Sequence, residues 1–250
     1  SSVVAPRSTT TYKHRAGDAL VVAGSRTKIG AAKLEAEAAL RAGAGLATIL
    51  TWSDALPTLA AWAREVMLLE IAAGDIAKTV SQALAKRSAV VIGPGLGLDR
   101  DAAELVKAVL SLATMPVVVD ADALTLVAKT GSLPRSNAAF ILTPHAGELA
   151  RLLKTDAAAI EADRFSAVAR AAKEFHAVVV LKGAHTLIAS PAGDIRVANF
   201  ANPVLATAGS GDVLAGIIAA FAATLKPFNA ACAGVCLHAL AAEKWCSETG

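Results

Sequence analysis

The segment Gly209-Ser210-Gly211-Asp212 combines residue types that can bind an anion and move a proton. Two glycines around a serine let successive backbone N–H groups point into one concavity, and an apolar helix predicted directly after them adds the positive end of its dipole. We therefore predict that this segment holds a phosphate group. Asp212 is then either a cap of that helix or a base that removes a hydroxyl proton while the N–H groups stabilise a phosphoryl group.

A second glycine-rich segment, AVVIGPGLG, places Gly93, Gly95 and Gly97 directly after a predicted buried strand. Its spacing matches neither the dinucleotide fingerprint nor the phosphate loop of nucleoside triphosphatases. It is either a tight turn or a place where the backbone approaches a flat ligand with no side chain between them. Asp120 and Asp122 end the next strand, where they could bind a metal through water or cap a helix. For Asp122 we favour the cap.

Two further strand ends carry polar side chains. His145 follows the strand AFILT, and Glu148 lies three residues later, on the same face of a predicted helix. The pair is either structural or a substrate contact that helps to order a metal and its waters. Lys182 and Gly183 follow the strand AVVVL, where a cation and free backbone groups could meet a nucleotide.

Strand and helix patterns alternate along the chain without a linker or an internal repeat. Short apolar runs predict buried strands at residues 19–24, 45–51, 66–71, 89–93, 115–120, 138–143 and 177–183, and Ala-rich periodic stretches predict helices at 31–41, 56–64, 75–86, 99–112, 122–129, 145–153 and 156–175. This alternation predicts a parallel sheet with helices on both faces. The segments TLIAS and DIRVAN then predict an antiparallel strand pair, and two long helices end the chain. We expect a single domain over residues 1–250, with 1–14 as a flexible N-terminal segment.

The composition excludes several classes of protein. The chain has 250 residues, 55% hydrophobic and 18% charged, so it can bury a large core. Its longest uncharged runs fall short of the roughly 18–20 apolar residues that span a bilayer, which argues against a membrane protein. The net charge of +3 is scattered, which argues against nucleic-acid binding. The odd count of three cysteines and the absence of an export signal predict a reducing, cytoplasmic location.

Six segments carry a resemblance to a known family. They are GAAKLEAEAALRAGAGLATI (30–49), VIGPGLG (91–97), VVDADAL (118–124), LTPHAGELARLL (142–153), VVLKGAHTLIASPAG (179–193) and NPVLATAGSGDVLAGIIAAF (202–221). In this order, and over residues 15–238, they resemble the ADP- or ATP-dependent NAD(P)H-hydrate dehydratases of the ribokinase-like superfamily. The resemblance implies a three-layer α/β/α sandwich with a mostly parallel central sheet and an antiparallel C-terminal strand pair.

The same resemblance implies a repair reaction. Hydrated NADH or NADPH would be phosphorylated on its hydroxyl at the expense of ADP or ATP, with Mg²⁺ present, and loss of phosphate would restore the reduced cofactor. Asp212 would activate the hydroxyl, and the N–H groups of residues 209–211 would hold the phosphoryl group. The choice between ADP and ATP, and between the two hydrates, stays open.

Site residues follow from the matching motifs. The substrate would contact Ala31, Gly95 or Gly97, His145 and Asp212; the adenine nucleotide would contact Lys182, Gly183, Ala184, His185, Thr186 and Gly211; and Glu148 would contact the metal through water. The resemblance also implies a homo-oligomer, commonly a tetramer, and an epimerase domain that is either fused or separate.

Two alternatives remain. A related kinase of a small alcohol, such as a thiazole or a pyrimidine, shares the GSGD motif but predicts Asn at position 145, where this chain has His145. A non-catalytic nucleotide-binding protein of the same fold predicts loss of Asp212, which is present.

Overall fold

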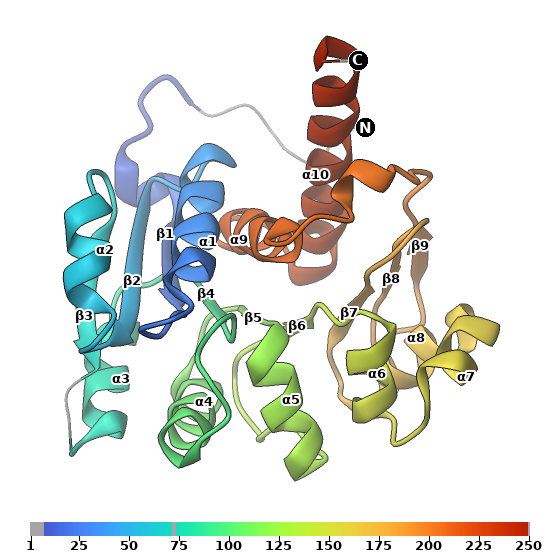
Figure 1. Cartoon of the computed structure of the whole chain (residues 1–250), viewed down its shortest axis with the longest axis horizontal. Coiled ribbons are helices and arrows are strands. Elements are labelled where there is room, and N and C mark those ends of the chain that lie inside the picture. Colours follow the sequence, from blue (N-terminus) through green and yellow to red (C-terminus); the bar gives the residue numbers. More distant parts are fainter. Residues whose placement is uncertain (1–7, 72–73, 250) are drawn as a thin grey trace.

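A nine-stranded sheet forms the centre of the molecule (Figure 1). The computed structural model describes residues 8–71 and 74–249. The strand order is β3-β2-β1-β4-β5-β6-β7-β8-β9; the strands from β1 to β7 are parallel, and β8 and β9 are antiparallel. The strands are β1 (Asp18–Val22), β2 (Leu46–Trp52), β3 (Met67–Ile71), β4 (Ala89–Ile92), β5 (Val117–Val119), β6 (Phe140–Leu142), β7 (Val178–Leu181), β8 (Leu187–Ala189) and β9 (Ile195–Val197). This confirms the predicted ribokinase-like architecture.

Helices cover both faces of the sheet (Figure 1). One layer contains α1 (Ile29–Arg41), α2 (Leu56–Trp62), α9 (Ser210–Ala222) and α10 (Pro227–Thr249). The other contains α3 (Ile76–Leu84), α4 (Arg100–Leu112), α5 (Ala121–Thr130), α6 (Ala146–Leu152), α7 (Ala157–Ala162) and α8 (Arg164–Glu174). Two short 3₁₀ helices, η1 (Lys13–Ala16) and η2 (Pro203–Leu205), complete the described elements.

The central strands are buried on both faces, which explains their continuous apolar sequences. In β4, Val90 and Ile92 pack into the core under α3 to α8, whereas Ala89 and Val91 pack into the core under α1, α9 and α10. Successive side chains of a strand point to opposite faces, so each face of the sheet receives every second residue. A parallel sheet between two helical layers therefore needs apolar residues at every position.

One predicted helix is divided in two. Residues 156–175 form α7 and α8, separated by Asp163, whose backbone leaves the helical region with φ −144° and ψ 77°. Its carboxylate accepts a hydrogen bond from the Ser166 N–H at 3.0 Å and so begins a new helix. An Asp side chain competes in this way with the helical hydrogen bonds of its neighbours.

The N-terminal segment is described only in part. The expected flexible segment of residues 1–14 lies outside the described residues over 1–7, and its last two residues belong to η1. Within the part of the chain that the structure describes, no helix is long and apolar enough to cross a membrane.

The strand order changes direction between β1 and β4. From β1 the chain proceeds outward to β2 and β3, then returns to β4 on the other side of β1. In sheets of this kind, ligands bind in the crevice outside the carboxyl ends of the strands at such a switch point. The loops after the two strands meet here, because the Gly24 N–H donates to the Pro94 carbonyl oxygen at 2.9 Å.

Candidate active site

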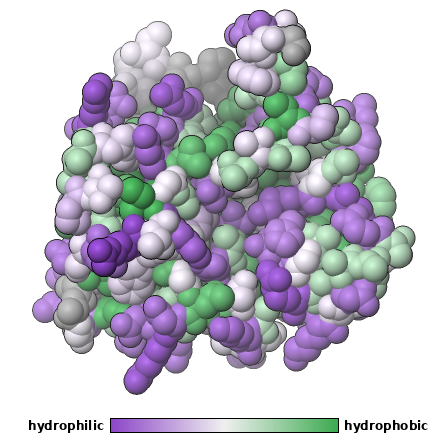
Figure 2. Space-filling model, viewed as in Figure 1, coloured by the Kyte–Doolittle hydropathy of each residue, from purple (hydrophilic) through white to green (hydrophobic). Residues whose placement is uncertain are grey.

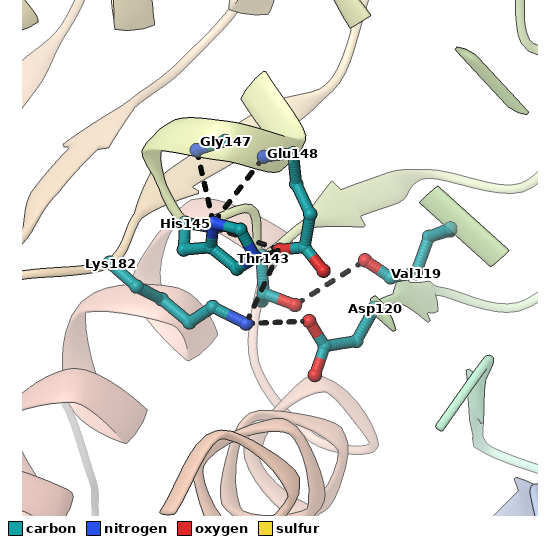
Figure 3. Close-up of polar contacts among 7 residues, drawn as sticks. All are labelled: Val119, Asp120, Thr143, His145, Gly147, Glu148 and Lys182. Atoms are coloured by element: carbon teal, nitrogen blue, oxygen red, sulfur yellow. Dashed lines mark hydrogen bonds and ion pairs between the residues drawn. The ribbon is translucent and has the colours of Figure 1, made fainter. Parts of the chain in front are cut away.

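A buried ion pair joins two strand ends. Asp120 directly follows β5 and Lys182 directly follows β7, and their Oδ1 and Nζ atoms are 2.8 Å apart (Figure 3). Glu148 Oε2 lies 3.8 Å from the same Nζ. Burial opposes the charge of Lys182, but the carboxylates of Asp120 and Glu148 outweigh it and raise the pKa of the ammonium above its ordinary value. Lys182 is therefore charged at neutral pH.

His145 and Glu148 form a reciprocal cap at the start of α6 (Figure 3). His145 Nδ1 accepts from the Gly147 N–H at 3.0 Å and from the Glu148 N–H at 3.4 Å, and Glu148 Oε2 accepts from the His145 N–H at 2.9 Å. An accepting Nδ1 places the proton of the neutral ring on Nε2. The pair therefore caps α6, and the ring of His145 still has more than half of its surface exposed, so a ligand contact stays open as a second role.

Capping and ligand contact at His145 can be separated by two substitutions. His145→Ala is expected to lower the free energy of unfolding by about 1 kcal/mol, whereas His145→Asn should keep most of it, because Asn is among the best capping residues. Chemical denaturation measures this difference. Equal stability of His145→Ala and the wild type would contradict the cap, and loss of turnover in both variants would indicate a ligand contact.

The predicted phosphate-binding segment begins α9. Gly209 is the N-cap with φ 85°, a conformation that favours glycine, and a Cβ there would lie 2.5 Å from Leu34 Cδ1 of α1. Ser210 Oγ lies 3.3 Å from His238 Nε2 of α10. A Cβ on Gly211 would lie 3.5 Å from Lys182 Nζ, so the loop passes beside the ammonium group. The head of α9 and the buried ion pair therefore form one site.

Asp212 lies in the first turn of α9 and is half-buried. Burial and the negative charge of Asp120 raise its pKa to about 6, while Lys182 opposes this rise. The carboxylate is therefore ionised at neutral pH and more basic than an exposed aspartate. The positive end of the α9 dipole also lies next to this carboxylate and stabilises its negative charge.

A cavity of about 790 Å³ opens beside these groups. Its walls include seven of the predicted residues: His145, Lys182, Gly183, Ala184, Thr186, Ser210 and Gly211. His185 is not among its lining residues, because its side chain is exposed and its N–H donates to the Phe200 carbonyl oxygen at 3.0 Å. Figure 2 shows hydrophilic residues gathered between α10 and α6 in the same view as Figure 1.

The glycine-rich loop after β4 lies at the switch point. Gly93 must be glycine, because a Cβ there would lie 1.8 Å from the Asp120 carbonyl oxygen. A Cβ on Gly95 would lie 2.8 Å from the carbonyl oxygen of Lys28, which precedes α1, so the loop packs close to the first turn of α1, where Ala31 lies. Gly95 thus lies close to the start of α1, where Ala31 is found, and Gly97 belongs to the same loop.

Asp122 does not cap α5, contrary to the expectation from the sequence. The N-cap of α5 is Asp120, and Asp122 lies inside the first turn. Its Oδ2 accepts from the Gly97 N–H at 2.9 Å and lies 3.5 Å from Lys28 Nζ. Asp122 therefore ties the glycine-rich loop to α5 and to the segment before α1.

Sequence reasoning assigned no role to two polar residues near the site, the half-buried His238 and the buried Glu35. His238 lines the cavity together with Val235 and Ala239, and these residues share one face of α10. Burial lowers the pKa of His238, so its ring is neutral beside Ser210. Glu35 is fully buried in α1. Glu35 lies three residues after Ala32 and four before Ala39, so helical spacing places it on the buried face of α1. This spacing could have identified Glu35 as a buried acid from the sequence.

The parallel sheet with an antiparallel edge, and the ligand site at the head of α9, define a ribokinase-like α/β protein. A family model described as NAD(P)H-hydrate dehydratase matches residues 19–250, and the chain belongs to this family. The predicted resemblance is thus confirmed.

Individual relatives agree with this membership. The chain is 43% identical over 248 residues to the bifunctional NAD(P)H-hydrate repair enzyme Nnr of Moorella thermoacetica, covering 96% of this chain and 47% of that protein. It is 43% identical over 246 residues to the ADP-dependent (S)-NAD(P)H-hydrate dehydratase of Neisseria meningitidis, covering 95% of this chain and 80% of that protein. The chain thus spans about half the length of its bifunctional relatives.

Solved structures show the same fold. The ADP/ATP-dependent NAD(P)H-hydrate dehydratase of Bacillus subtilis, crystallised with ATP and Mg²⁺, superposes with a TM-score of 0.88 at 32% identity, covering 99% of this chain and 87% of that one. The hydroxyethylthiazole kinase of Pyrococcus horikoshii superposes with a TM-score of 0.63 at 18% identity, which shows the shared fold alone.

Proposed function

We propose that the protein dehydrates hydrated NADH or NADPH with consumption of ADP or ATP. The observation that carries this proposal is the position of Asp212, a half-buried carboxylate of raised pKa at the N-terminus of α9, beside Lys182 and a cavity of nucleotide size. The family membership and the names of the relatives from Neisseria and Bacillus support it.

The site residues account for each step of such a reaction. Asp212 accepts the proton of the hydrate hydroxyl, and the hydroxyl oxygen attacks the terminal phosphorus of the nucleotide. The bond from that phosphorus to the rest of the nucleotide breaks, and AMP or ADP leaves. The N–H groups of Gly209 and Gly211 and the Lys182 ammonium stabilise charge on the transferred group, whereas the Ser210 N–H donates to the Thr207 carbonyl oxygen at 3.2 Å. The ring nitrogen of the substrate then expels phosphate, and loss of a proton from the adjacent carbon restores the double bond.

The two ligands occupy different parts of the site. The adenine nucleotide lies in the cavity along Lys182, Gly183, Ala184 and Thr186, with His185 contributing only backbone, and its last phosphate reaches Gly211. The dinucleotide substrate crosses the switch point along Ala31, Gly95 and Gly97 to His145 and Asp212. The lining of the cavity by His145, Lys182, Gly183, Ala184 and Thr186 supports the nucleotide part of this arrangement.

The residues present fit a Mg²⁺ ion that arrives with the nucleotide. Mg²⁺ keeps several waters and is usually held by one or two carboxylates together with phosphate oxygens. Glu148 Oε2 is occupied by the His145 N–H and lies near Lys182, but no described residue donates to its Oε1. Among the described residues no group of three or more His, Cys, Asp or Glu side chains could hold a metal alone. Glu148 would therefore contact the ion through water, and the ion would neutralise phosphate charge.

Assembly and location complete the proposal. We propose a cytoplasmic homo-oligomer, a tetramer as in the family, which works with a fused or separate epimerase. Leu237, Leu240 and Trp245 support assembly, because they expose large apolar side chains on α10. Light scattering of the purified protein measures the assembly, and a monomer would contradict it.

A turnover assay tests the function. The protein is incubated with NADH hydrate or NADPH hydrate, Mg²⁺ and either ADP or ATP, and the return of reduced-cofactor absorbance is followed. We expect recovery only with a nucleotide, with one phosphate released for each cofactor restored. No recovery with either nucleotide would contradict the proposal, and phosphorylation of a thiazole or pyrimidine alcohol instead would favour the related kinases.

A further inference from the structure

Glu35 is a fully buried acid with no partner among the described residues. It lies in the second turn of α1 with no exposed surface, and neither Oε1 nor Oε2 has a hydrogen-bond partner there. An isolated carboxylate in such a place is costly, because burial penalises its charge. The group is therefore neutral or serves a nearby charged site.

Helices α1 and α9 lie side by side (Figure 1), and the closest approaches between them are made by Leu34 and Glu35. A Cβ on Gly216 would lie 2.3 Å from the Glu35 carbonyl oxygen, so the two backbones touch. The side chain of Leu34 meets Gly209, three residues before Asp212. Asp212 and Gly216 are four residues apart and share one face of α9. Side chains of a helix lean toward its N-terminus, so Glu35 leans toward the site end of α1.

Four carboxyl groups and one ammonium group lie around the head of α9: Glu35, Asp120, Glu148, Asp212 and Lys182. Burial raises the pKa of Glu35 well above its ordinary value of 4.5, and the negative charges of Asp212 and Asp120 raise it further. Lys182 faces Asp120 and Glu148 across the sheet end. Glu35 is fully buried whereas Asp212 is half-buried, so burial opposes a negative charge more strongly on Glu35 than on Asp212, whose pKa is about 6. At neutral pH Glu35 is therefore neutral and Asp212 is ionised.

We propose that Glu35 and Asp212 form a carboxyl pair that holds one proton, and that the proton stays on Glu35, so that Asp212 carries the charge that the reaction uses. Glu35 is a positioning residue in this arrangement, because it does not touch the substrate. The proposal rests on the proposed dehydratase function. It also implies an upper pH limit: once Glu35 ionises, a second negative charge beside Asp212 opposes binding of the nucleotide phosphates.

The pH dependence of kcat/KM for NADH hydrate tests this pair. Glu35→Gln keeps the shape and the neutrality of the side chain but cannot lose a proton. We expect kcat/KM at pH 7 within about threefold of the wild type, the same acid limb near Asp212's pKa, and an alkaline limb moved upward by about one pH unit or more. Glu37→Gln is the matched control, because Glu37 lies on the same helix but lines a separate cavity with Arg41 and Trp62. An unmoved alkaline limb in Glu35→Gln would overturn the proposal.

A second measurement needs no substrate and so separates this proposal from the proposed function. Because the pKa of folded Glu35 is raised, the native state binds more protons than the unfolded state above pH 4.5, and stability from this group falls as pH rises. Gln cannot lose a proton, so Glu35→Gln should not share this loss of stability. Above pH ~5, the ratio of its folding equilibrium constant to that of the wild type should therefore rise about tenfold per pH unit, which is about 1.4 kcal/mol. A pH-independent difference would show that Glu35 is already charged and would overturn the pair.

Infrared spectroscopy of the wild type covers the case in which Glu35→Gln does not fold. At pH 8, where Asp212 is ionised, we expect a carbonyl band of one protonated, buried carboxyl group. Its absence would contradict a proton on Glu35, whatever the outcome of the turnover assay.

Discussion

Asp212→Asn is expected to lower kcat for hydrate dehydration by about 10²–10⁴-fold, the usual contribution of a general base, while nucleotide affinity changes little. Asn keeps the size of the side chain in the first turn of α9, but it cannot accept the hydroxyl proton. Steady-state kinetics measures kcat, and calorimetry with ADP and with ATP measures affinity. The wild type should also lose activity about tenfold per pH unit below pH 6, because protonation removes the base. The residual activity of the variant should lack this limb.

Asp101→Asn provides the control for Asp212. Asp101 is an exposed acid in the first turn of α4, as Asp212 is in the first turn of α9, but it lies outside the candidate site. We expect wild-type kinetics from it. If Asp212→Asn loses nucleotide binding and stability together with turnover, Asp212 is a structural cap and not the base.

Lys182→Met should remove nucleotide binding and destabilise the fold together. Its ammonium is the partner of the buried Asp120 at 2.8 Å, and removing one member of a buried ion pair typically costs about 3–5 kcal/mol. The double variant Lys182→Met, Asp120→Asn removes the unpaired charge of Asp120, and Glu148 keeps its hydrogen bond from the His145 N–H, so we expect much of the stability to return while nucleotide affinity stays low. Urea denaturation and calorimetry measure the two quantities separately.

Lys107→Met is the control for Lys182. Lys107 is exposed on α4, in the helical layer that does not contain α9 and α10. It should match the wild type in both measurements. Nucleotide affinity restored in the double variant would mean that Lys182 acts only by neutralising Asp120.

The apolar pattern predicted every strand that the structure describes. Continuous runs of Val and Ile, such as Val117–Val119, are typical of strands in a sheet that is buried on both faces. It also predicted that His145 and Lys182 lie at one edge of the sheet, since each follows a strand and parallel strands end at one edge. The segment at 209–212 follows η2 and not a strand, so its place beside Lys182 was implied only by the family resemblance. It failed at Asp163, where a side-chain cap interrupts a continuous helical pattern, and at Asp122, whose partner is a loop 25 residues away.

The outer wall of the cavity was beyond sequence reasoning. Phe200, Asn202 and Thr207 belong to the connection between β9 and α9, and His238 comes from α10. No local pattern marks these residues. Their place follows from the docking of α10 over the end of the sheet, which depends on the whole fold.

The contact between Leu34 and Gly209 has a consequence for how the protein acquires its site during folding. It joins segments 175 residues apart in sequence (209 − 34), and the sheet between them is built from parallel, non-local pairings. Such contacts form late, because loop closure must precede them. During synthesis β1 to β7 leave the ribosome before α9 does, so the contact between Leu34 and Gly209 can form only once the segment that begins α9 has been made.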